Sequence, residues 1–380
     1  MSTSGACMNS LPNNRPNEVP YDKSVTVRSL LESTGVSSLL AKAGATELAI
    51  NRAGEIWTES RDGWICHAAP QATLDALKKL ANALVVFKGD HLSAANPIHP
   101  VLLPDGQRGQ VLIAPAVEPD TVSITMRVPS AMRLSMSDYE SSGSLKGYKD
   151  ASPKTILTLA APADLHLNGY DDASPLGRVP SVVDLALFEL AMLEAKASGD
   201  IGTFLALAIE NKLNVVTVGA PGSGKTTLMK GLIDLVGRDT RIGTIEDTAE
   251  LALPNHPNRV HMFFSDDLPA KEIVRSTLRM KFDRVFLAEL RGDETWDYLT
   301  LLNTGHKGGM TSVHANDCIS AFSRITTLVK ASTVGQTLDL SYIAREVKMT
   351  IDVVLFMENK RLKQVFFDPV GKWKLQRGLA

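Results

Sequence analysis

The amino-terminal third of the chain mixes strand-like and helix-like hydrophobic patterns. In residues 121–128, TVSITMRV, every even-numbered position is apolar and Arg127 falls on the polar face, which predicts a half-buried strand. Residues 72–87, ATLDALKKLANALVVF, carry apolar residues at helical spacing and predict a helix. Shorter strands are expected at TELAI, EIWTE and GWICHA, residues 46–50, 55–59 and 63–68. We therefore expect a small α+β domain over residues 23–130.

Two segments lack a hydrophobic period. Residues 131–180 are rich in Ser, Gly, Asp, Pro and Tyr, and we interpret them as an extended linker with room for one short helix. Residues 1–22 contain many Asn, Pro and Ser, which predicts a disordered lead-in without the pattern of a secretory signal. The second domain is then expected over residues 181–380.

Strand and helix patterns alternate from residue 181 onward. Ser181 and Asp184 match a capping box that opens an amphipathic helix, and Gly199 is its expected end. Such alternation predicts an α/β domain with a mainly parallel sheet covered by helices on both faces. Two late strands can form a hairpin across Asn359–Arg361. The predicted strands are 213–218, 241–247, 259–265, 284–289, 309–315, 349–358 and 362–367, and the predicted helices are 225–236, 270–281 and 293–302.

Composition and charge narrow the class of protein. The 380 residues exceed what one hydrophobic core normally holds, so two domains are expected. Forty basic and 42 acidic residues leave a net charge of −2, so no direct sequence-specific binding of nucleic acid is expected. Cys7, Cys66 and Cys318 are widely spaced and form no CxxC pair, which indicates a reducing compartment and argues against structural zinc. Acidic residues interrupt the longest apolar run, so no membrane-spanning helix is predicted.

One short motif carries the first chemical signal. GAPGSGKTT, residues 219–227, satisfies the phosphate-loop pattern G-x-x-x-x-G-K-[ST] and lies between a strand pattern and a helix pattern, as that motif requires. Its glycines let backbone amides surround a phosphate at the positive end of the helix. Lys225 offers positive charge to the outer phosphates, and Thr226 offers a hydroxyl to Mg²⁺. A guanine-reading motif is absent, which favours ATP. The nucleotide-binding residues are expected to be Gly219, Ala220, Pro221, Gly222, Ser223, Gly224, Lys225, Thr226 and Thr227.

Acidic residues stand at the ends of two predicted strands. IGTIED ends in Glu246 and Asp247, with Glu250 shortly after, and RVFLAE runs into Glu289. The carboxyl ends of strands in an open parallel sheet gather around such a phosphate loop. Glu246 and Glu289 are therefore candidates for orienting the attacking water. Asp247 and Glu250 are candidates to join Thr226 at Mg²⁺, and ordinary solvated acids are the alternative interpretation.

Two histidines lie in NTGHKGGMTSVHAN, residues 303–316. His314 closes the strand pattern GMTSVHA, so we expect it at the same edge, where an imidazole can hydrogen-bond a γ-phosphate or the carboxylate that holds the water. His306 precedes that strand and can reach the same place or a neighbouring subunit. A pair of structural histidines is the alternative, and a metal site that includes Cys318 lacks a fourth ligand.

Four stretches together resemble the secretion ATPases, and most closely the ring-forming traffic ATPases of type IV secretion systems: GAPGSGKTT, IEDTAEL, LRMKFDRVFLAELRGDE and NTGHKGGMTSVHAN. They match that family's phosphate loop, aspartate box, second acidic motif and histidine box in order and spacing over roughly residues 200 to 320. The amino-terminal region resembles the family through TELAINRAGEIWTE and RGQVLIAPAVEPDTVSITMRVPS. Ala288 and Phe282 stand where the family commonly has Gly and Pro, and neither change removes a functional group.

This resemblance implies a RecA-like P-loop ATPase domain preceded by a smaller α+β domain. It further implies a homo-hexameric ring that is cytoplasmic and peripheral on the inner membrane, with other secretion-apparatus ATPases and inner-membrane components as partners. ATP and Mg²⁺ would be its cofactors, and hydrolysis would power pilus biogenesis or the transfer of DNA or protein. By motif position, Arg108 and Arg127 would approach the γ-phosphate from the amino-terminal domain; a solvated strand arginine is the alternative for Arg127.

Three other functions compete with this hypothesis. A type II secretion or pilus-retraction ATPase shares the motifs, although the residues of the histidine box and the lack of a four-cysteine metal module favour type IV secretion. A nucleotide-gated assembly scaffold with negligible turnover would also bind ATP, but the presence of Lys225, Glu246 and Glu289 argues against it. A nucleic-acid-stimulated motor is disfavoured by the neutral charge and by the absence of a basic and aromatic patch.

Overall fold

The chain forms two compact units, Met1–Pro129 and Ser130–Ala380. The computed structural model describes residues 22–42, 44–60, 63–128, 133–153, 183–265 and 267–378. The expected lead-in therefore lies outside the described residues apart from Asp22. Within the described ranges, no helix is both long and apolar enough to cross a membrane.

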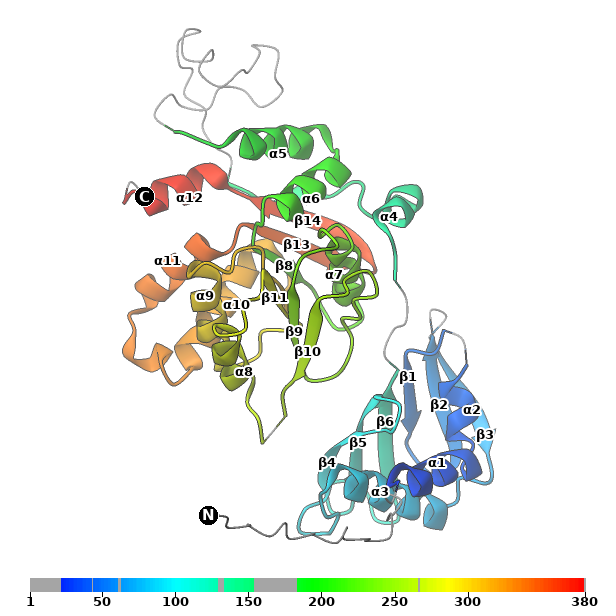
Figure 1. The fold of residues 1–380 in the computed structure, drawn as a ribbon. Coiled ribbons are helices and arrows are strands. Elements are labelled where there is room, and N and C mark those ends of the chain that lie inside the picture. Colours follow the sequence, from blue (N-terminus) through cyan, green and yellow to red (C-terminus); the bar gives the residue numbers. More distant parts are fainter. Residues whose placement is uncertain are drawn as a thin grey trace, which may run out of the picture. The chain divides into compact units, whose positions relative to one another are not determined.

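The first unit is a six-stranded antiparallel sheet with the strand order β3-β2-β1-β6-β5-β4. Its three helices cover one face (Figure 1), where Ile124 and Met126 are fully buried. Arg127 is exposed, so the alternation predicted for this strand is confirmed. The elements are α1 (Ser24–Ser33), α2 (Val36–Leu40), β1 (Glu47–Ile50), β2 (Gly54–Ser60), β3 (Gly63–Ala69), α3 (Leu74–Lys88), β4 (Ile98–Leu102), β5 (Arg108–Ile113) and β6 (Val122–Arg127).

The second unit contains an eight-stranded sheet with the order β10-β9-β11-β12-β8-β13-β14-β7. The first six strands in this order are parallel, and only the β13–β14 pair is antiparallel. Every residue of β8, β9, β11 and β12 is buried, as expected for strands covered on both faces. The predicted parallel sheet is thus confirmed. The strands are β7 (Lys149–Asp150), β8 (Val215–Val218), β9 (Ile242–Glu246), β10 (Arg259–Phe263), β11 (Arg284–Leu287), β12 (Met310–Val313), β13 (Val353–Glu358) and β14 (Arg361–Phe367).

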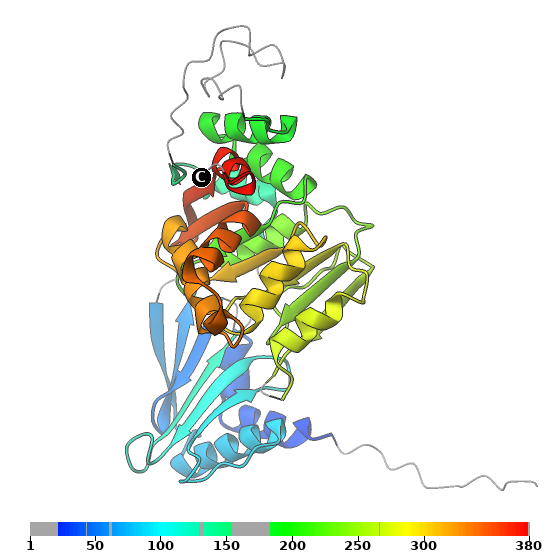
Figure 2. The same ribbon diagram turned by 90° about the vertical axis from the view of Figure 1, so that its left-hand side faces the viewer.

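Helices pack on both faces of this second sheet and enclose two cores. Phe204 on α6 (Ile201–Glu210) and Leu228 on α7 (Lys225–Ile233) belong to one core, and Tyr298 and Ile325 belong to the other. The helices of the second core lie in front of the strands in Figure 2. The helices are α4 (Met136–Ser142), α5 (Leu187–Ser198), α6 (Ile201–Glu210), α7 (Lys225–Ile233), α8 (Ala270–Thr277), α9 (Glu294–Asn303), α10 (Cys318–Ala331), α11 (Leu340–Thr350) and α12 (Pro369–Gln376).

Part of the expected linker is built into the second unit. Helix α4 buries Tyr139 in the core beside α7, and β7 pairs with β14. The buried ammonium of Lys196, on α5, ties this segment down by lying 3.0 Å from Asp150 Oδ2 and donating to Ser152 Oγ at 2.8 Å. Residues 154–180 of the expected linker lie outside the described residues.

The helix predicted to open at Ser181 begins later. Its first residue is Leu187, because the Glu189 carboxylate accepts a hydrogen bond from the Ala186 amide at 2.8 Å and so fixes the first turn there. Ser181 itself lies outside the described residues. The predicted end is confirmed: Gly199 adopts φ 80° as the C-cap.

Candidate functional site at the carboxyl edge of the parallel sheet

The phosphate loop leaves the end of β8 and enters α7. Gly219, Gly222 and Gly224 have φ angles of 147°, 71° and 100°, which only glycine adopts without steric cost. A Cβ atom at Gly219 would collide with the carbonyl oxygen of Met357, at the end of the adjacent strand β13. The turn after β13 also supports the loop, because the Lys360 amide donates to the Ser223 carbonyl at 3.0 Å. The predicted β13–β14 hairpin therefore helps to shape the phosphate loop.

Lys225 lies inside the curve of this loop, at the first residue of α7. It is 7% exposed, and its Nζ donates to the carbonyl oxygens of Gly219 at 2.8 Å and Ala220 at 2.9 Å. The positive end of the helix and the ammonium therefore act at the same place. The hydroxyl of Ser223 is buried there and has no hydrogen-bond partner within the described part of the chain. These groups suit a phosphate, which brings oxygen acceptors to all of them.

Glu289 and His314 meet at this edge of the sheet. Glu289 follows β11 and His314 follows β12, which lies between β11 and β8. Nε2 of His314 is 3.1 Å from Oε1 of Glu289. Nδ1 of the same ring is 3.0 Å from the Gly219 carbonyl oxygen and 3.3 Å from Lys225 Nζ. The structure thus brings together four residues that the sequence placed at strand ends or in the loop.

Arg291 is a member of this edge that sequence reasoning missed. Its Nη1 donates to Asp247 Oδ2 at 2.6 Å, and its Nη2 donates to Glu289 Oε2 at 2.9 Å. Burial alone would lower the pKa of Arg291, but the hydrogen bonds and the charges of Glu289 and Asp247 raise it overall. The guanidinium therefore stays charged and bridges the ends of β9 and β11. The only sequence signal was its position two residues after Glu289 in LRGDE.

Glu246 does not join this network. Its side chain is fully buried, and its oxygens accept hydrogen bonds from the amides of Glu250 at 2.8 Å and Leu251 at 2.7 Å and from the hydroxyl of Thr244 at 2.9 Å. The carboxylate thus holds the loop that follows β9, and it has little capacity left for a water. These contacts point to a structural task for Glu246, and the water-orienting role expected from its strand end stays a prediction.

The two carboxylates expected at Mg²⁺ both interact with basic side chains. Asp247 pairs with Arg291, and the charge of Glu250 acts on Lys230, whose pKa is lowered chiefly by burial. The described ranges contain no group of three or more His, Cys, Asp or Glu side chains able to hold a metal ion. Thr226, on the first turn of α7, still fits Mg²⁺, because this ion commonly takes few protein ligands and completes its shell with phosphate and water.

His306 lies at the opposite edge of the sheet. It precedes β12, whereas His314 follows it, and a strand of four residues spans roughly 13 Å. The loop that carries His306 is held at the amino end of the strand, where Asn214 Oδ1 accepts from the amides of Gly308 at 3.0 Å and Gly309 at 3.1 Å. Within one chain His306 therefore lies away from His314 and the phosphate loop, and its expected reach to a neighbouring subunit stays a prediction.

Arg108 and Arg127 belong to the first unit and face each other across β5 and β6. Met126 packs in the helix-covered core, so the neighbouring Arg127 leaves the sheet on the other face, and its register partner Arg108 does the same. Arg127 Nε is 3.8 Å from Glu47 Oε1, whose pKa is raised chiefly by burial. The two arginines thus present positive charge together on the face opposite the described helices.

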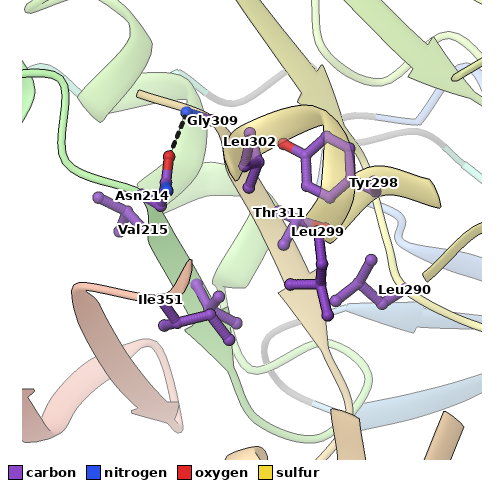
Figure 3. Close-up of a pocket in the computed structure, with 10 residues that line it drawn as sticks. Asn214, Val215, Leu290, Tyr298, Leu299, Leu302, Gly309, Thr311 and Ile351 are labelled. Carbon is purple, nitrogen blue, oxygen red and sulfur yellow. Dashed lines mark hydrogen bonds between the residues drawn. The ribbon is translucent and has the colours of Figure 1, made fainter. Parts of the chain in front are cut away.

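A small cavity lies inside the second unit, between β8, β12 and α9 (Figure 3). Its volume of about 10 Å³ matches about one water molecule, and its lining is almost wholly apolar. Tyr298 closes it by donating to the carbonyl oxygens of Val285 at 2.9 Å and Met310 at 3.1 Å. The cavity is therefore a packing gap under α9 and is too small for a nucleotide. The lining residues are Asn214, Val215, Val216, Leu290, Tyr298, Leu299, Leu302, Gly309, Thr311 and Ile351.

Comparison with known proteins agrees with this architecture. The family described as Type II/IV secretion system protein matches residues 180–360. The type IV secretion system protein VirB11 of Brucella abortus biovar 1 is 33% identical over 342 residues, which cover 86% of each chain. The type IV secretion system protein PtlH of Bordetella pertussis is 31% identical over 328 residues, 84% of this chain and 87% of that protein.

A solved structure extends the likeness to the fold. The ATPase DotB of Yersinia pseudotuberculosis is 14% identical and aligns with 95% of this chain and 85% of its own, with a TM-score of 0.54. The fold, a RecA-like ATPase unit preceded by a smaller α+β unit, is thus shared over most of both chains. Together with the identity to VirB11 over most of both chains, this places the protein among the secretion motors. The chain belongs to the VirB11 family of type IV secretion ATPases.

Proposed function

We propose that this protein hydrolyses ATP to ADP and phosphate in a Mg²⁺-dependent reaction at the edge formed by the phosphate loop, Glu289 and His314. The observation that carries the proposal is the position of His314, which contacts the Gly219 carbonyl with one nitrogen and Glu289 with the other. The phosphate-binding loop and a carboxylate able to orient water are thereby joined through one side chain.

Each residue has a defined task in this reaction. The amides of the loop and Lys225 bind the outer phosphates, and Glu289 orients the attacking water and accepts its proton. When bound through Thr226 and the phosphates, Mg²⁺ supplies positive charge to the phosphate oxygens. Lys225 and His314 share the Gly219 carbonyl, so movement of the ammonium toward a phosphate changes the surroundings of His314. His314 can pass that change to Glu289 and so report whether a γ-phosphate is present.

We further propose that the active form is a homo-hexameric ring, peripheral on the cytoplasmic side of the inner membrane and in contact with other secretion ATPases and inner-membrane components. Arg108 and Arg127 would then approach the γ-phosphate and stabilise the charge that develops on it. Their common direction on the face opposite the described helices supports this role. Hydrolysis in the ring would power pilus biogenesis or the transfer of DNA or protein.

The test is phosphate release by the full chain with and without Mg²⁺. Lys225→Ala should abolish ATP binding and release, whereas Lys348→Ala, at an exposed position of α11, should match the unmodified protein. Unchanged release by Lys225→Ala would refute the assignment of the loop. ATP binding without release at any protein concentration would instead favour the nucleotide-gated scaffold.

A further inference from the structure

Arg291 joins two loops that leave the sheet at neighbouring strands. One arm of its guanidinium donates to Asp247, after β9, and the other donates to Glu289, after β11, at 2.6 Å and 2.9 Å. Because the guanidinium is planar and its donors are fixed in a fork, the two carboxylates are held in one geometry. This contact is the direct link between the loop after β9 and the carboxylate assigned to the water.

The backbone beneath this side chain is fixed as well. Glu294, the first residue of α9, accepts with Oε1 from the amides of Arg291 at 2.7 Å and Gly292 at 2.9 Å. The backbone of Arg291 is therefore held against α9, so its side chain starts from a fixed position when it extends to Glu289. On the other side, Glu246 anchors the loop that carries Asp247 through the amides of Glu250 and Leu251.

Glu289 is consequently held from two directions. His314 lies at Oε1 and Arg291 at Oε2, at 3.1 Å and 2.9 Å. A carboxylate with a contact at each oxygen has little freedom to rotate about its last torsion angle. Removal of either contact would let it turn away from the water it must orient, and a displacement of about 1 Å can cost ~100-fold in rate.

We propose that Arg291 is a positioning residue for ATP hydrolysis. It orients the Glu289 carboxylate and, through its hydrogen bond to Asp247, couples this orientation to the loop after β9. The inference rests on the proposed ATPase function of this edge. Arg291 need not touch the nucleotide, so its effect should fall on kcat and leave ATP binding nearly unchanged. Because Arg291 is held by Asp247, loss of Arg291 or of Asp247 should disturb the same orientation of Glu289.

Kinetics of the full chain test this assignment. Arg291→Ala should lower kcat by about 10- to 100-fold, while KM for ATP changes less than about threefold. Asp247→Asn should give a smaller loss, and adding it to Arg291→Ala should cause little further loss, because the pair acts as a unit. Arg291→Lys should recover only part of the rate, since an ammonium cannot hold both carboxylates as the fork does.

Arg275 provides the matched control, because it pairs with Asp297 at 2.8 Å between α8 and α9 and, among the described residues, forms no hydrogen bond or ion pair with the site. Arg275→Ala should turn over ATP at the normal rate. Normal kcat in Arg291→Ala, or a loss explained wholly by raised KM or a lowered unfolding temperature, would overturn the positioning role while leaving the ATPase intact. Failure of the unmodified protein to release phosphate would overturn both.

Discussion

Nε2 of His314 lies 3.1 Å from Oε1 of Glu289, so the ends of β12 and β11 are joined by a direct contact. The other nitrogen of the imidazole contacts the Gly219 carbonyl of the phosphate loop at 3.0 Å. A change at the phosphate loop can therefore reach the carboxylate through one ring. This arrangement assigns the signalling role to His314, which follows β12, and not to His306, which precedes this strand.

The two histidines should consequently differ in their effect on turnover. We expect His314→Ala to lower kcat by at least about tenfold, because Glu289 loses one of its two contacts. His306→Ala, at the opposite end of β12, should change kcat by less than about twofold. Steady-state phosphate release of both variants measures the difference. Equal losses in the two would mean that His306 reaches an active site in the assembled ring.

Contribution of the arginines by another subunit can be tested by mixing inactive variants. Lys225→Ala retains Arg108 and Arg127, whereas Arg127→Ala retains the phosphate loop. If a site takes its loop from one subunit and its arginines from another, mixed rings should recover activity. In an equal mixture, about a quarter of the sites would combine an intact loop with intact arginines. Phosphate release after subunit exchange gives the readout.

The same hypothesis predicts that turnover per chain rises steeply with protein concentration as rings assemble. A flat rate over a hundredfold range, together with no recovery on mixing, would speak against sites that are completed between subunits. Recovery with a flat rate would mean that the ring is already assembled at the lowest concentration used.

Glu246 should matter for stability more than for chemistry. Glu246→Gln replaces one acceptor oxygen by an amide and weakens charge-assisted bonds to two backbone amides and one hydroxyl, so the free energy of unfolding should fall by roughly 1.5–3 kcal/mol. Thermal or urea unfolding measures this loss. Glu289→Gln is the matched control, because Glu289 is partly exposed and should leave stability nearly unchanged. The opposite ranking would mean that Glu246 is not the anchor of its loop.

Protonation of a helix-capping aspartate should lower the free energy of unfolding at acidic pH. Hydrogen bonds from the backbone and side chain of Ser320 lower the pKa of Asp317, the N-cap of α10. Since the folded-state pKa is lowered, this contribution is complete above the ordinary aspartate pKa of about 3.9 and is lost as pH falls through the folded value. Unfolding temperatures between pH 6 and pH 3 should therefore fall less steeply for Asp317→Asn, which caps without titrating. Parallel curves for the two proteins would contradict this account.

Much of the ATPase fold could be predicted from the chain alone, because strands buried on both faces leave long apolar runs between helical patterns. The first unit was harder to predict. Strand β4 contains Pro100, which weakens a strand prediction. Strand β5 contains Gly109, where a Cβ atom would lie 2.7 Å from the Thr125 carbonyl oxygen. The glycine is required by the close approach of β6, which no local pattern reveals.

The site was predictable where strand ends determine it. The phosphate loop, Glu289 and His314 follow directly from parallel strands that end at one edge. Glu246 also ends a strand, but the loop after it folds back and occupies its carboxylate. Arg291 could not be foreseen, because its importance depends on Asp247, which is 44 residues away in sequence and adjacent only in the folded sheet.

The central claim is that Glu289 orients the water while the phosphate loop binds the nucleotide. The most direct test compares ATP binding and phosphate release in Glu289→Gln, which preserves shape and removes the charge. We predict ATP affinity within about threefold of the unmodified protein and release slowed by at least about 100-fold. Phosphate release at the normal rate by this variant would contradict the account and remove Glu289 from the reaction.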